Sequence, residues 1–587
     1  MSGARRRHPR PVTERTGRRH RGRERHTVAL VLLMLGLVAV SARLVYLQVY
    51  AAPAFAEKAQ LQRTRDIEIA PKRGTIYDRD GQPLAVSREA RTIYASPRFV
   101  TEPRSAAEAL AGVLGGDVEE YAERLSRDTG FVYIARKTTV EKAELVEALD
   151  LAGIGVLKDS RRTYPGGDLA AQVLGFVGTD NEGLAGLEQY YDTVLAGKPG
   201  SILAERDPFG RVIPGGVMHF EEPVDGADIV ISIDKDIQHA AQSALQRAVD
   251  EWEAESGSVI VMDPRNGEIL AMASAPGFNP NRFGEADSEA YRNRPVSGVY
   301  EPGSTFKAIT AAAVLDAGLF TPDSMFELPP ALQIGGWRIS EARPRKTVNW
   351  SLTEIIEKSS NVGSVKLAQA LGEKGFYDYV TRFGFTERTG VDYPAEAVGF
   401  LPPLEQWSAT TIANIPFGQG VSMTPLQLAR GIAAIANGGE LVTPHFLLDG
   451  GEGEQQAEWP RKRVISQEAA ADTREVLKVA SGDPNMVEGY VVAGKTGTAQ
   501  KARIDGRGYA PDKFIGSFAG FLPADDPQVL IVVVVDEPKG TYYGRVVSVP
   551  VFAEVAHFAV SHLKIQPTPS DDVRADENEP ATPAAEP

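Results

Sequence analysis

One continuous apolar stretch, Thr27–Tyr50, constrains this chain most, because it can supply the roughly 20 residues that a membrane-spanning helix needs. Arginines next to such a span keep that end of the chain in the cytoplasm. The pattern predicts a cytoplasmic segment over residues 1–26, a single-pass plasma-membrane anchor over 27–50, and an extracytoplasmic remainder. Residues 1–26 carry ten arginines against Glu14 and Glu24: Arg5, Arg6, Arg7, Arg10, Arg15, Arg18, Arg19, Arg21, Arg23 and Arg25.

A cleaved signal peptide is the alternative interpretation of this stretch, since Ala54-Phe55-Ala56 has the small-x-small form of a cleavage site. The long arginine-rich segment and an apolar stretch longer than a signal core favour an uncleaved anchor.

Charge and residue usage exclude several classes of function. The net charge is −15, although ten arginines minus two glutamates give +8 over residues 1–26. Such an arm can bind nucleic acid, but its position before an apolar span indicates the membrane, so no nucleic-acid partner is expected. The absence of cysteine excludes disulfides, a thiolate nucleophile and cysteine-bound metal. The eight histidines show no H-E-x-x-H spacing, and neither a metal nor another cofactor is expected.

The chain after the anchor divides by pattern. Residues 51–225 mix helical and strand signals, including a hairpin over Ala70–Ser87 around an Asp80-Gly81 turn. They predict a mixed α/β domain, followed by a linker over 226–255 and a second domain over 256–565. Residues 566–587 are rich in proline and acidic residues without periodicity, which predicts a disordered tail.

Within 256–565, strand signals enclose a helical block. Ser256–Ser274 contains two apolar runs joined by a turn, and a helix is expected after Gly303, ending near Ala317-Gly318. Ser351-Leu352-Thr353-Glu354 is a capping box that opens another helix. Late strands are expected over 490–500, 514–523 and 528–538. This order predicts an α+β fold with an antiparallel sheet flanked by helices.

Gly489–Thr496 fits the P-loop pattern G-x-x-x-x-G-K-[ST], which would make the chain a membrane-tethered ATPase. A P-loop needs an irregular anion-binding turn followed by a helix. The intervening Tyr490-Val491-Val492-Ala493 favours an extended strand, and Gly497 falls where the helix should be established. The P-loop match is therefore interpreted as accidental.

The same segment also completes a set of three motifs, in order along the chain. These are Ser304-x-x-Lys307, Ser359-x-Asn361 and Lys495-Thr496-Gly497-Thr498. S-x-x-K alone is weak evidence, since Ser232–Lys235 and Ser561–Lys564 also match it. Only Ser304 follows a Pro-Gly pair at a predicted helix start, where its hydroxyl would lie at the positive end of the helix.

With these motifs the chain resembles the class B penicillin-binding proteins, which are membrane-anchored peptidoglycan D,D-transpeptidases. The resemblance extends from the anchor to about residue 565. It implies a penicillin-binding (serine transpeptidase) domain preceded by a pedestal domain of the dimerisation type. Other segments that resemble the family are Arg73–Ala85, Thr163–Gly178, Gly183–Gly200 and Phe417–Gly439.

The resemblance implies roles for the first two motifs. Ser304 is the nucleophile and Lys307, if neutral, is the base that takes its proton. Ser359 relays a proton to the departing D-alanine, and Asn361 positions both the substrate amide and Lys307.

The third motif is implied to bind the substrate. Lys495 attracts the terminal carboxylate of the peptide, and the hydroxyls of Thr496 and Thr498 hold it beside Gly497. The backbone N–H groups of Ser304 and Thr498 are implied to form the oxyanion hole.

The implied function is cross-linking of stem peptides through a serine acyl-enzyme that β-lactams trap. The Ser-Ser-Asn form of the second motif resembles that of the division-type, FtsI-like branch. This resemblance implies that the cross-linked material is septal cell wall. The implied partners are a D-Ala-D-Ala donor, an amine acceptor, a SEDS-family glycosyltransferase and other division proteins. An elongation-type transpeptidase and a non-catalytic β-lactam sensor or division scaffold remain open as alternatives.

Overall fold

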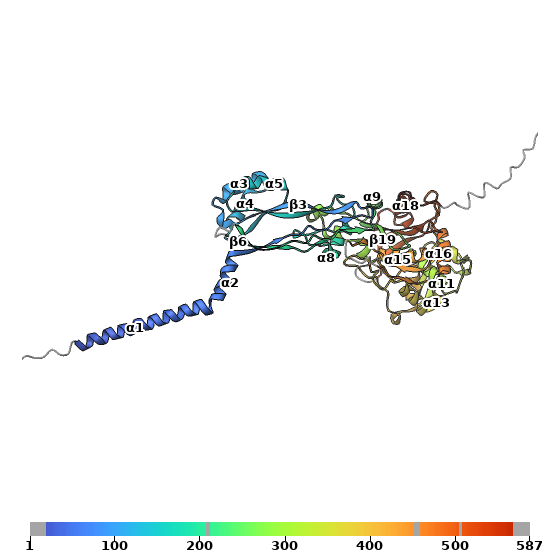
Figure 1. Cartoon of the computed structure of the whole chain (residues 1–587). Coiled ribbons are helices and arrows are strands. Elements are labelled where there is room, and N and C mark those ends of the chain that lie inside the picture. Colours follow the sequence, from blue (N-terminus) through green and yellow to red (C-terminus); the bar gives the residue numbers. More distant parts are fainter. Residues whose placement is uncertain (1–18, 207–211, 451–457, 504–507, 568–587) are drawn as a thin grey trace, which may run out of the picture. The chain divides into compact units, whose positions relative to one another are not determined.

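The computed structural model describes residues 19–206, 212–450, 458–503 and 508–567 (Figure 1). The predictions for residues 1–18 and for the tail from 568 lie outside the described residues. The chain forms two compact units. The first comprises Met1–Ile69 and Pro199–Glu222, and the second comprises Ala70–Lys198 and Pro223–Pro587. The stretch 51–225, expected to be one pedestal domain, contributes to both.

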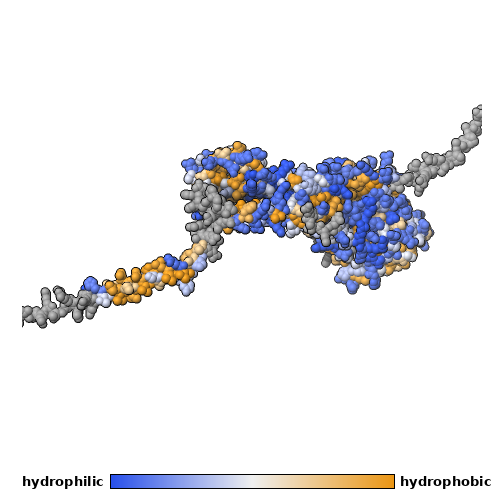
Figure 2. Space-filling model, viewed as in Figure 1, coloured by the Kyte–Doolittle hydropathy of each residue, from blue (hydrophilic) through white to orange (hydrophobic). Residues whose placement is uncertain are grey.

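The first unit contains the predicted apolar helix. Arg25–Tyr50 is long and apolar enough to cross a membrane and has none of its apolar window buried, and Figure 2 shows it as a hydrophobic rod. A three-stranded antiparallel sheet in the order β1-β6-β7 completes this unit. Its elements are α1 (Arg19–Val45), a π-helical turn (Tyr46–Tyr50), α2 (Ala52–Arg63), β1 (Thr64–Ile69), β6 (Gly200–Arg206) and β7 (Val212–Glu221).

The second unit begins with the predicted hairpin. β2 (Ile76–Tyr77) pairs antiparallel with β3 (Pro83–Ala95), and Gly81 has a φ of 77°, which the turn requires and glycine permits. β3 also pairs with β4 (Val132–Thr138) and β5 (Ile154–Thr163). Helices α3 (Pro103–Leu114), α4 (Val118–Leu125) and α5 (Val140–Glu147) pack together near one end of β3 (Figure 1).

A buried ion network links Arg73, which precedes this hairpin, to Arg162 and Glu188, which follow it in the chain. The Glu188 carboxylate accepts hydrogen bonds from Arg73 Nε at 2.7 Å and Arg162 Nε at 2.6 Å. Asp192 accepts a further bond from Arg73 Nη1 at 2.6 Å. The short helices α6 (Ala171–Leu174), α7 (Gly186–Tyr190) and α8 (Asp192–Leu195) carry or adjoin these acidic groups.

The predicted α+β domain has a five-stranded antiparallel sheet in the order β10-β9-β20-β19-β18. Alternate residues of β20 point into two different apolar cores, Leu530 and Val532 into one, Ile531 and Val533 into the other. Both faces of this strand are therefore covered, which explains its unbroken apolar run. The strands are β9 (Ser256–Met262), β10 (Ile269–Ala275), β18 (Ala493–Ala502), β19 (Tyr509–Leu522) and β20 (Val529–Asp536).

Helices cover the two faces of this sheet. α9 (Lys235–Glu251) and α18 (Val549–His562) share one core, whereas α11 (Lys307–Asp316) and α15 (Pro425–Ala436) belong to the other. Figure 1 shows α9 with α18 and α11 with α13 and α16. The remaining helices of this domain are α10 (Arg294–Ser297), α12 (Leu352–Glu357), α13 (Asn361–Arg382), α14 (Ala409–Asn414), α16 (Gln467–Ala480) and α17 (Gly544–Val547).

Two local predictions are confirmed here and one segment differs. The Ser351–Glu354 capping box forms at the start of α12, and α11 ends before Gly318, whose φ is 64°. Residues 226–255, for which the sequence predicted a linker, contain β8 (Ile229–Ile231) and α9. The apolar residues of α9 pack into a sheet core, so this stretch is part of the folded domain.

Small two-stranded sheets complete the domain. β12 (Ala331–Ile334) pairs with β13 (Trp337–Ser340), which leads directly to Glu341. The other two-stranded sheets are β11 (Met325–Leu328) with β14 (Val348–Ser351), and β15 (Glu440–Val442) with β17 (Arg461–Arg463). β16 (Leu447–Asp449) pairs with β8 at the edge of the six-stranded sheet that contains β2 and β3.

Candidate active site

The first motif lies at a tight turn before α11. Ser304 is half-buried in a single 3₁₀ turn, Gly303–Phe306, and Lys307 is the first residue of α11. Gly303 has a φ of 57°, and its N–H donates to Gly418 O at 3.1 Å. A Cβ at Gly303 would lie 3.1 Å from Thr498 O, so a larger residue would strain this approach to β18.

The second motif meets Lys307 across 52 to 54 residues of sequence. Lys307 Nζ donates to Ser359 O at 2.6 Å, Ser359 Oγ at 3.2 Å and Asn361 Oδ1 at 2.8 Å. Ser359 has a φ of 56°, a conformation that costs a non-glycine residue on the order of 1–3 kcal/mol. This strained turn precedes α13, which begins at Asn361.

The electrostatic surroundings favour a neutral Lys307. Burial lowers the pKa of Lys307 well below its ordinary value, the positive charge of Lys495 lowers it further, and the carboxylate of Glu341 raises it. A neutral amine has two N–H donors and one lone pair. Ser359 O and Asn361 Oδ1 can accept both N–H bonds, which leaves the lone pair to receive a hydroxyl proton.

The third motif lies on β18, at the edge of the sheet and against the turn that carries Ser304. Gly497 allows this approach, because a Cβ there would lie 2.3 Å from Ser517 Oγ and 2.9 Å from Thr305 Cγ2. Burial alternates along β18, with Lys495 and Gly497 buried and Thr496 and Thr498 half-buried. The lysine and the two threonines therefore project from opposite faces of the strand.

Lys495 is a buried cation with little compensation from the protein. The residue is 2% exposed, and in the described part of the chain the one hydrogen bond of its Nζ is a long contact to Thr496 O at 3.4 Å. Burial lowers the pKa of Lys495 to about 8. An anionic ligand group would supply the missing partner. Thr498 Oγ1 accepts from Gly544 N at 3.3 Å, so its hydroxyl proton is left to donate.

The structure thus brings all three predicted motifs to one place, with one difference from the expected pairing. Among the described residues, the hydrogen bonds of Lys307 Nζ go to Ser359 and Asn361, and none goes to Ser304 Oγ. Hydrogen bonds of a catalytic base are commonly long before substrate binds. The P-loop alternative is wrong, since Gly494–Thr498 is extended strand paired with β19, and the next element after β18 among the described residues is β19 and not a helix.

Sequence reasoning missed two acidic residues near the motifs. Glu341 accepts from Asn361 N at 2.7 Å, although it lies 20 positions away in no recognisable pattern. Glu301 accepts from Gly420 N at 3.0 Å, and burial raises the pKa of its carboxyl group. The position of Glu301 directly before Pro302-Gly303 is the one signal that could have drawn attention to it.

Asp80, Asp234 and His562 offer three donor atoms that lie within 4.8 Å of one another and could hold a metal ion. The Asp234 carboxylate, however, caps α9 by accepting from Asp236 N and Ile237 N, and it pairs with His562 Nε2 at 2.9 Å. These contacts account for its buried position without a metal.

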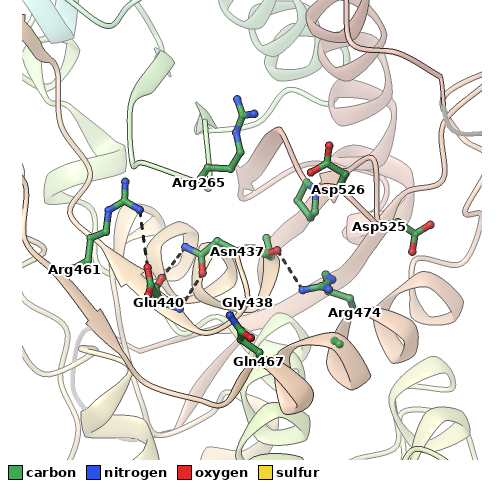
Figure 3. Close-up of a pocket in the computed structure, with 12 residues that line it drawn as sticks. Arg265, Asn437, Gly438, Glu440, Arg461, Gln467, Arg474, Asp525 and Asp526 are labelled. Carbon is green, nitrogen blue, oxygen red and sulfur yellow. Dashed lines mark hydrogen bonds and ion pairs between the residues drawn. The ribbon is translucent and has the colours of Figure 1, made fainter.

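A cavity of about 520 Å³ lies elsewhere in the same unit, and none of its lining residues belongs to the three motifs (Figure 3). Its polar groups largely satisfy one another. Arg461 lies 4.0 Å from the Glu440 carboxylate, Asn437 Nδ2 donates to Glu440 O at 2.7 Å, and Arg474 donates to Ala436 O at 3.5 Å.

Known proteins resemble the chain over most of its length. It is 36% identical to stage V sporulation protein D of Bacillus subtilis, covering 92% of this chain and 86% of that protein. It is 32% identical to the peptidoglycan D,D-transpeptidase FtsI of Escherichia coli, with 91% of each chain covered. Penicillin-binding protein 3 of Mycobacterium tuberculosis in complex with aztreonam is similar in structure, with a TM-score of 0.68, 30% identity, and 86% and 98% coverage.

A serine at a helix start, a buried lysine beside a Ser-x-Asn turn, and an edge strand bearing Lys-Thr-Gly-Thr define the class of penicillin-recognising serine enzymes. Residues 257–557 match the penicillin-binding protein transpeptidase domain, and residues 68–231 match the penicillin-binding protein dimerisation domain. The chain belongs to the penicillin-binding protein family. It is a member of the class B branch, in which a dimerisation domain precedes the transpeptidase domain.

Proposed function

We propose that this chain is a peptidoglycan D,D-transpeptidase that cross-links stem peptides of the septal cell wall through an acyl-enzyme on Ser304. The observation that carries the proposal is the contact of buried Lys307 Nζ with Ser359 and Asn361 at 2.6–3.2 Å, next to the strand that bears Lys495. Substrate peptides that end in D-Ala-D-Ala are the donors, and β-lactams are trapped at the same serine.

Acylation follows from these positions. Ser304 Oγ attacks the carbonyl carbon of the penultimate D-alanine, and its proton passes to neutral Lys307. The oxyanion receives hydrogen bonds from the backbone N–H groups of Ser304 and Thr498, each worth about 3 kcal/mol in such sites. The amide C–N bond breaks, and the departing D-alanine amine takes a proton by way of Ser359 Oγ, which lies 3.2 Å from Lys307 Nζ.

In this proposal the edge strand β18 binds the substrate peptide. Lys495 attracts the terminal carboxylate through its charge, whereas the hydroxyls of Thr496 and Thr498, on the other face of β18, donate hydrogen bonds to it. Gly497 keeps the strand close to Ser304. In the second half-reaction an amine from a neighbouring stem peptide attacks the Ser304 ester. Its proton leaves through Lys307, the ester C–O bond breaks, and Ser304 is regenerated as the cross-link forms.

The proposal extends to location and partners. The helix over Arg25–Tyr50 anchors the chain in the plasma membrane, with the arginine-rich end in the cytoplasm and the catalytic domain outside. Glycan polymerisation belongs to a partner, a SEDS-family glycosyltransferase in the same membrane, within the set of division proteins.

Purified full-length chain in detergent, given a stem pentapeptide donor and an amine acceptor, tests this function. Release of free D-alanine together with the cross-linked product is expected, and Ser304→Ala should abolish both. Tight penicillin binding without any D-alanine release would instead identify a non-catalytic sensor.

A further inference from the structure

Glu341 lies directly behind the second motif. One oxygen of its carboxylate accepts from Ser360 Oγ at 2.6 Å, and the other accepts from Asn361 N at 2.7 Å. The neighbouring Ser340 O accepts from Asn361 Nδ2 at 3.2 Å. The segment at the end of β13 therefore accepts hydrogen bonds from both the backbone N–H and the side-chain amide of Asn361. These two bonds orient the Asn361 side chain so that its Oδ1 accepts from Lys307 Nζ.

Glu341 is itself held in place. Arg345 Nη2 donates to its carboxylate at 2.6 Å, and Arg345 Nη1 donates to Leu328 O at 2.8 Å. The guanidinium also lies 4.9 Å above the centre of the Trp350 ring. The side chains of Glu341 and Arg345 are only 9% and 13% exposed, so solvent screens this pair weakly.

These contacts stabilise a turn that is costly on its own. Ser359 adopts a φ of 56° so that its carbonyl oxygen faces Lys307 Nζ. The next two residues, Ser360 and Asn361, are the ones that donate to Glu341. Asn361 N is the first N–H of α13, so the Glu341 carboxylate lies at the helix N-terminus, where a negative charge is favourable.

We propose that Glu341 is a positioning residue of the transpeptidation site, which holds the Ser359–Asn361 turn against Lys307 and sets the charge balance around that lysine. The inference rests on the proposed function of Ser304 and Lys307. Glu341 touches neither substrate nor reacting atoms, and it acts through Asn361 and through its field.

The charge balance has two sides. Lys495 from β18 lowers the pKa of Lys307, whereas Glu341 raises it, and Arg345 offsets part of the Glu341 charge. The Glu341 charge thus lowers the fraction of Lys307 that is neutral near neutral pH, while the hydrogen bonds of Glu341 hold the Ser359–Asn361 turn in position. Removal of its charge alone should lower the pKa of Lys307, so the base would become available at a lower pH.

The test is the second-order rate constant of acylation by a fluorescent penicillin, measured against pH for the full-length protein. Glu341→Gln is nearly isosteric but presents an N–H₂ group to at least one of the three donors, Ser360 Oγ, Asn361 N and Arg345 Nη2. We expect its acidic limb to move down by about one pH unit. We expect its plateau rate to fall about tenfold, as for loss of one charge-assisted hydrogen bond.

Two further variants separate charge from geometry. Glu341→Asp keeps the charge but draws the carboxylate back, so its plateau should fall while its acidic limb stays at the wild-type pH. Glu327→Gln removes one negative charge from the exposed face of β11 and should match wild type in both respects.

The outcomes are distinct. A Glu341→Gln profile that overlays wild type, or that falls equally at every pH without moving its acidic limb, would overturn the inference and leave the proposed function intact. Failure of wild-type protein to acylate at Ser304 would overturn the proposed function and the inference with it.

Discussion

Lys307 Nζ lies 2.6 Å from the backbone carbonyl oxygen of Ser359, whose φ of 56° is rare for a residue other than glycine. The strained turn at Ser359 and the buried amine of Lys307 depend on one another. The turn supplies a backbone carbonyl that can accept an N–H from the lysine in either charge state, and burial lowers the pKa of Lys307, which favours the neutral base.

Asn361→Ala should slow penicillin acylation about 100-fold, because it removes the acceptor that holds Lys307 Nζ at 2.8 Å. The acylation rate constant should fall more than the affinity for intact penicillin, which loses one amide contact, and stopped-flow fluorescence separates the two. Asn349→Ala, in the exposed part of β14, is the matched control and should behave as wild type. Equal rates in the two variants would remove Asn361 from the site.

Acylation efficiency should decline above about pH 8, where Lys495 loses its proton and its attraction for the ligand carboxylate. Burial lowers this pKa, so the charged form is present below it and lost as pH rises through it. Lys495→Arg stays protonated throughout and should abolish the alkaline limb, although its larger head lowers the overall rate. An alkaline limb that persists unchanged in Lys495→Arg would assign it to another group.

The penicilloyl-enzyme should persist, with a burst of one acylation per protein and very slow release. In class A β-lactamases a glutamate between the second and third motifs, with an asparagine four residues on, holds the hydrolytic water. Glu373, Glu387, Glu396 and Glu405 are not followed by asparagine at that spacing. The Glu396 carboxylate is already engaged by Thr389 N, Thr389 Oγ1 and Gly390 N. Steady multiple-turnover hydrolysis of penicillin would move the protein to the hydrolases.

Glu188→Ala should destabilise the protein by about 3–5 kcal/mol, because it leaves Arg73 and Arg162 buried without their shared carboxylate. Thermal unfolding should show the loss as a lower midpoint. Glu119→Ala breaks the exposed pair with Arg104 and should leave the midpoint close to wild type. A Glu188→Ala midpoint equal to that of Glu119→Ala would mean that the network contributes nothing.

Local patterns predicted much of this architecture, because caps, turns and strand periodicity act over a few residues. The capping box at Ser351, the Asp80-Gly81 hairpin and the antiparallel strands over 256–274 are confirmed. The strand form of Gly494–Thr498 decided between the two interpretations of Lys495. The motif patterns likewise indicated which residues would converge.

Contacts between residues far apart in the sequence could not be predicted from these local patterns. Glu341 belongs to no motif, and its value depends on a meeting with Asn361 that only the folded chain creates. The sequence predicted a linker over residues 226–255, and the packing of α9 into the sheet core is a contact between residues far apart in the chain that a local pattern does not show. Neither the positive φ of Ser359 nor the two-sided burial of β20 follows from spacing alone.

Labelling of the full-length protein with a fluorescent penicillin, followed by peptide mapping by mass spectrometry, tests the central claim most directly. We predict one covalent adduct per chain, on Ser304, and no adduct in a Ser304→Ala protein that unfolds at the wild-type temperature. An adduct on Ser232 or Ser561, the other serines in S-x-x-K sequences, or undiminished labelling of Ser304→Ala, would contradict the assignment of the nucleophile.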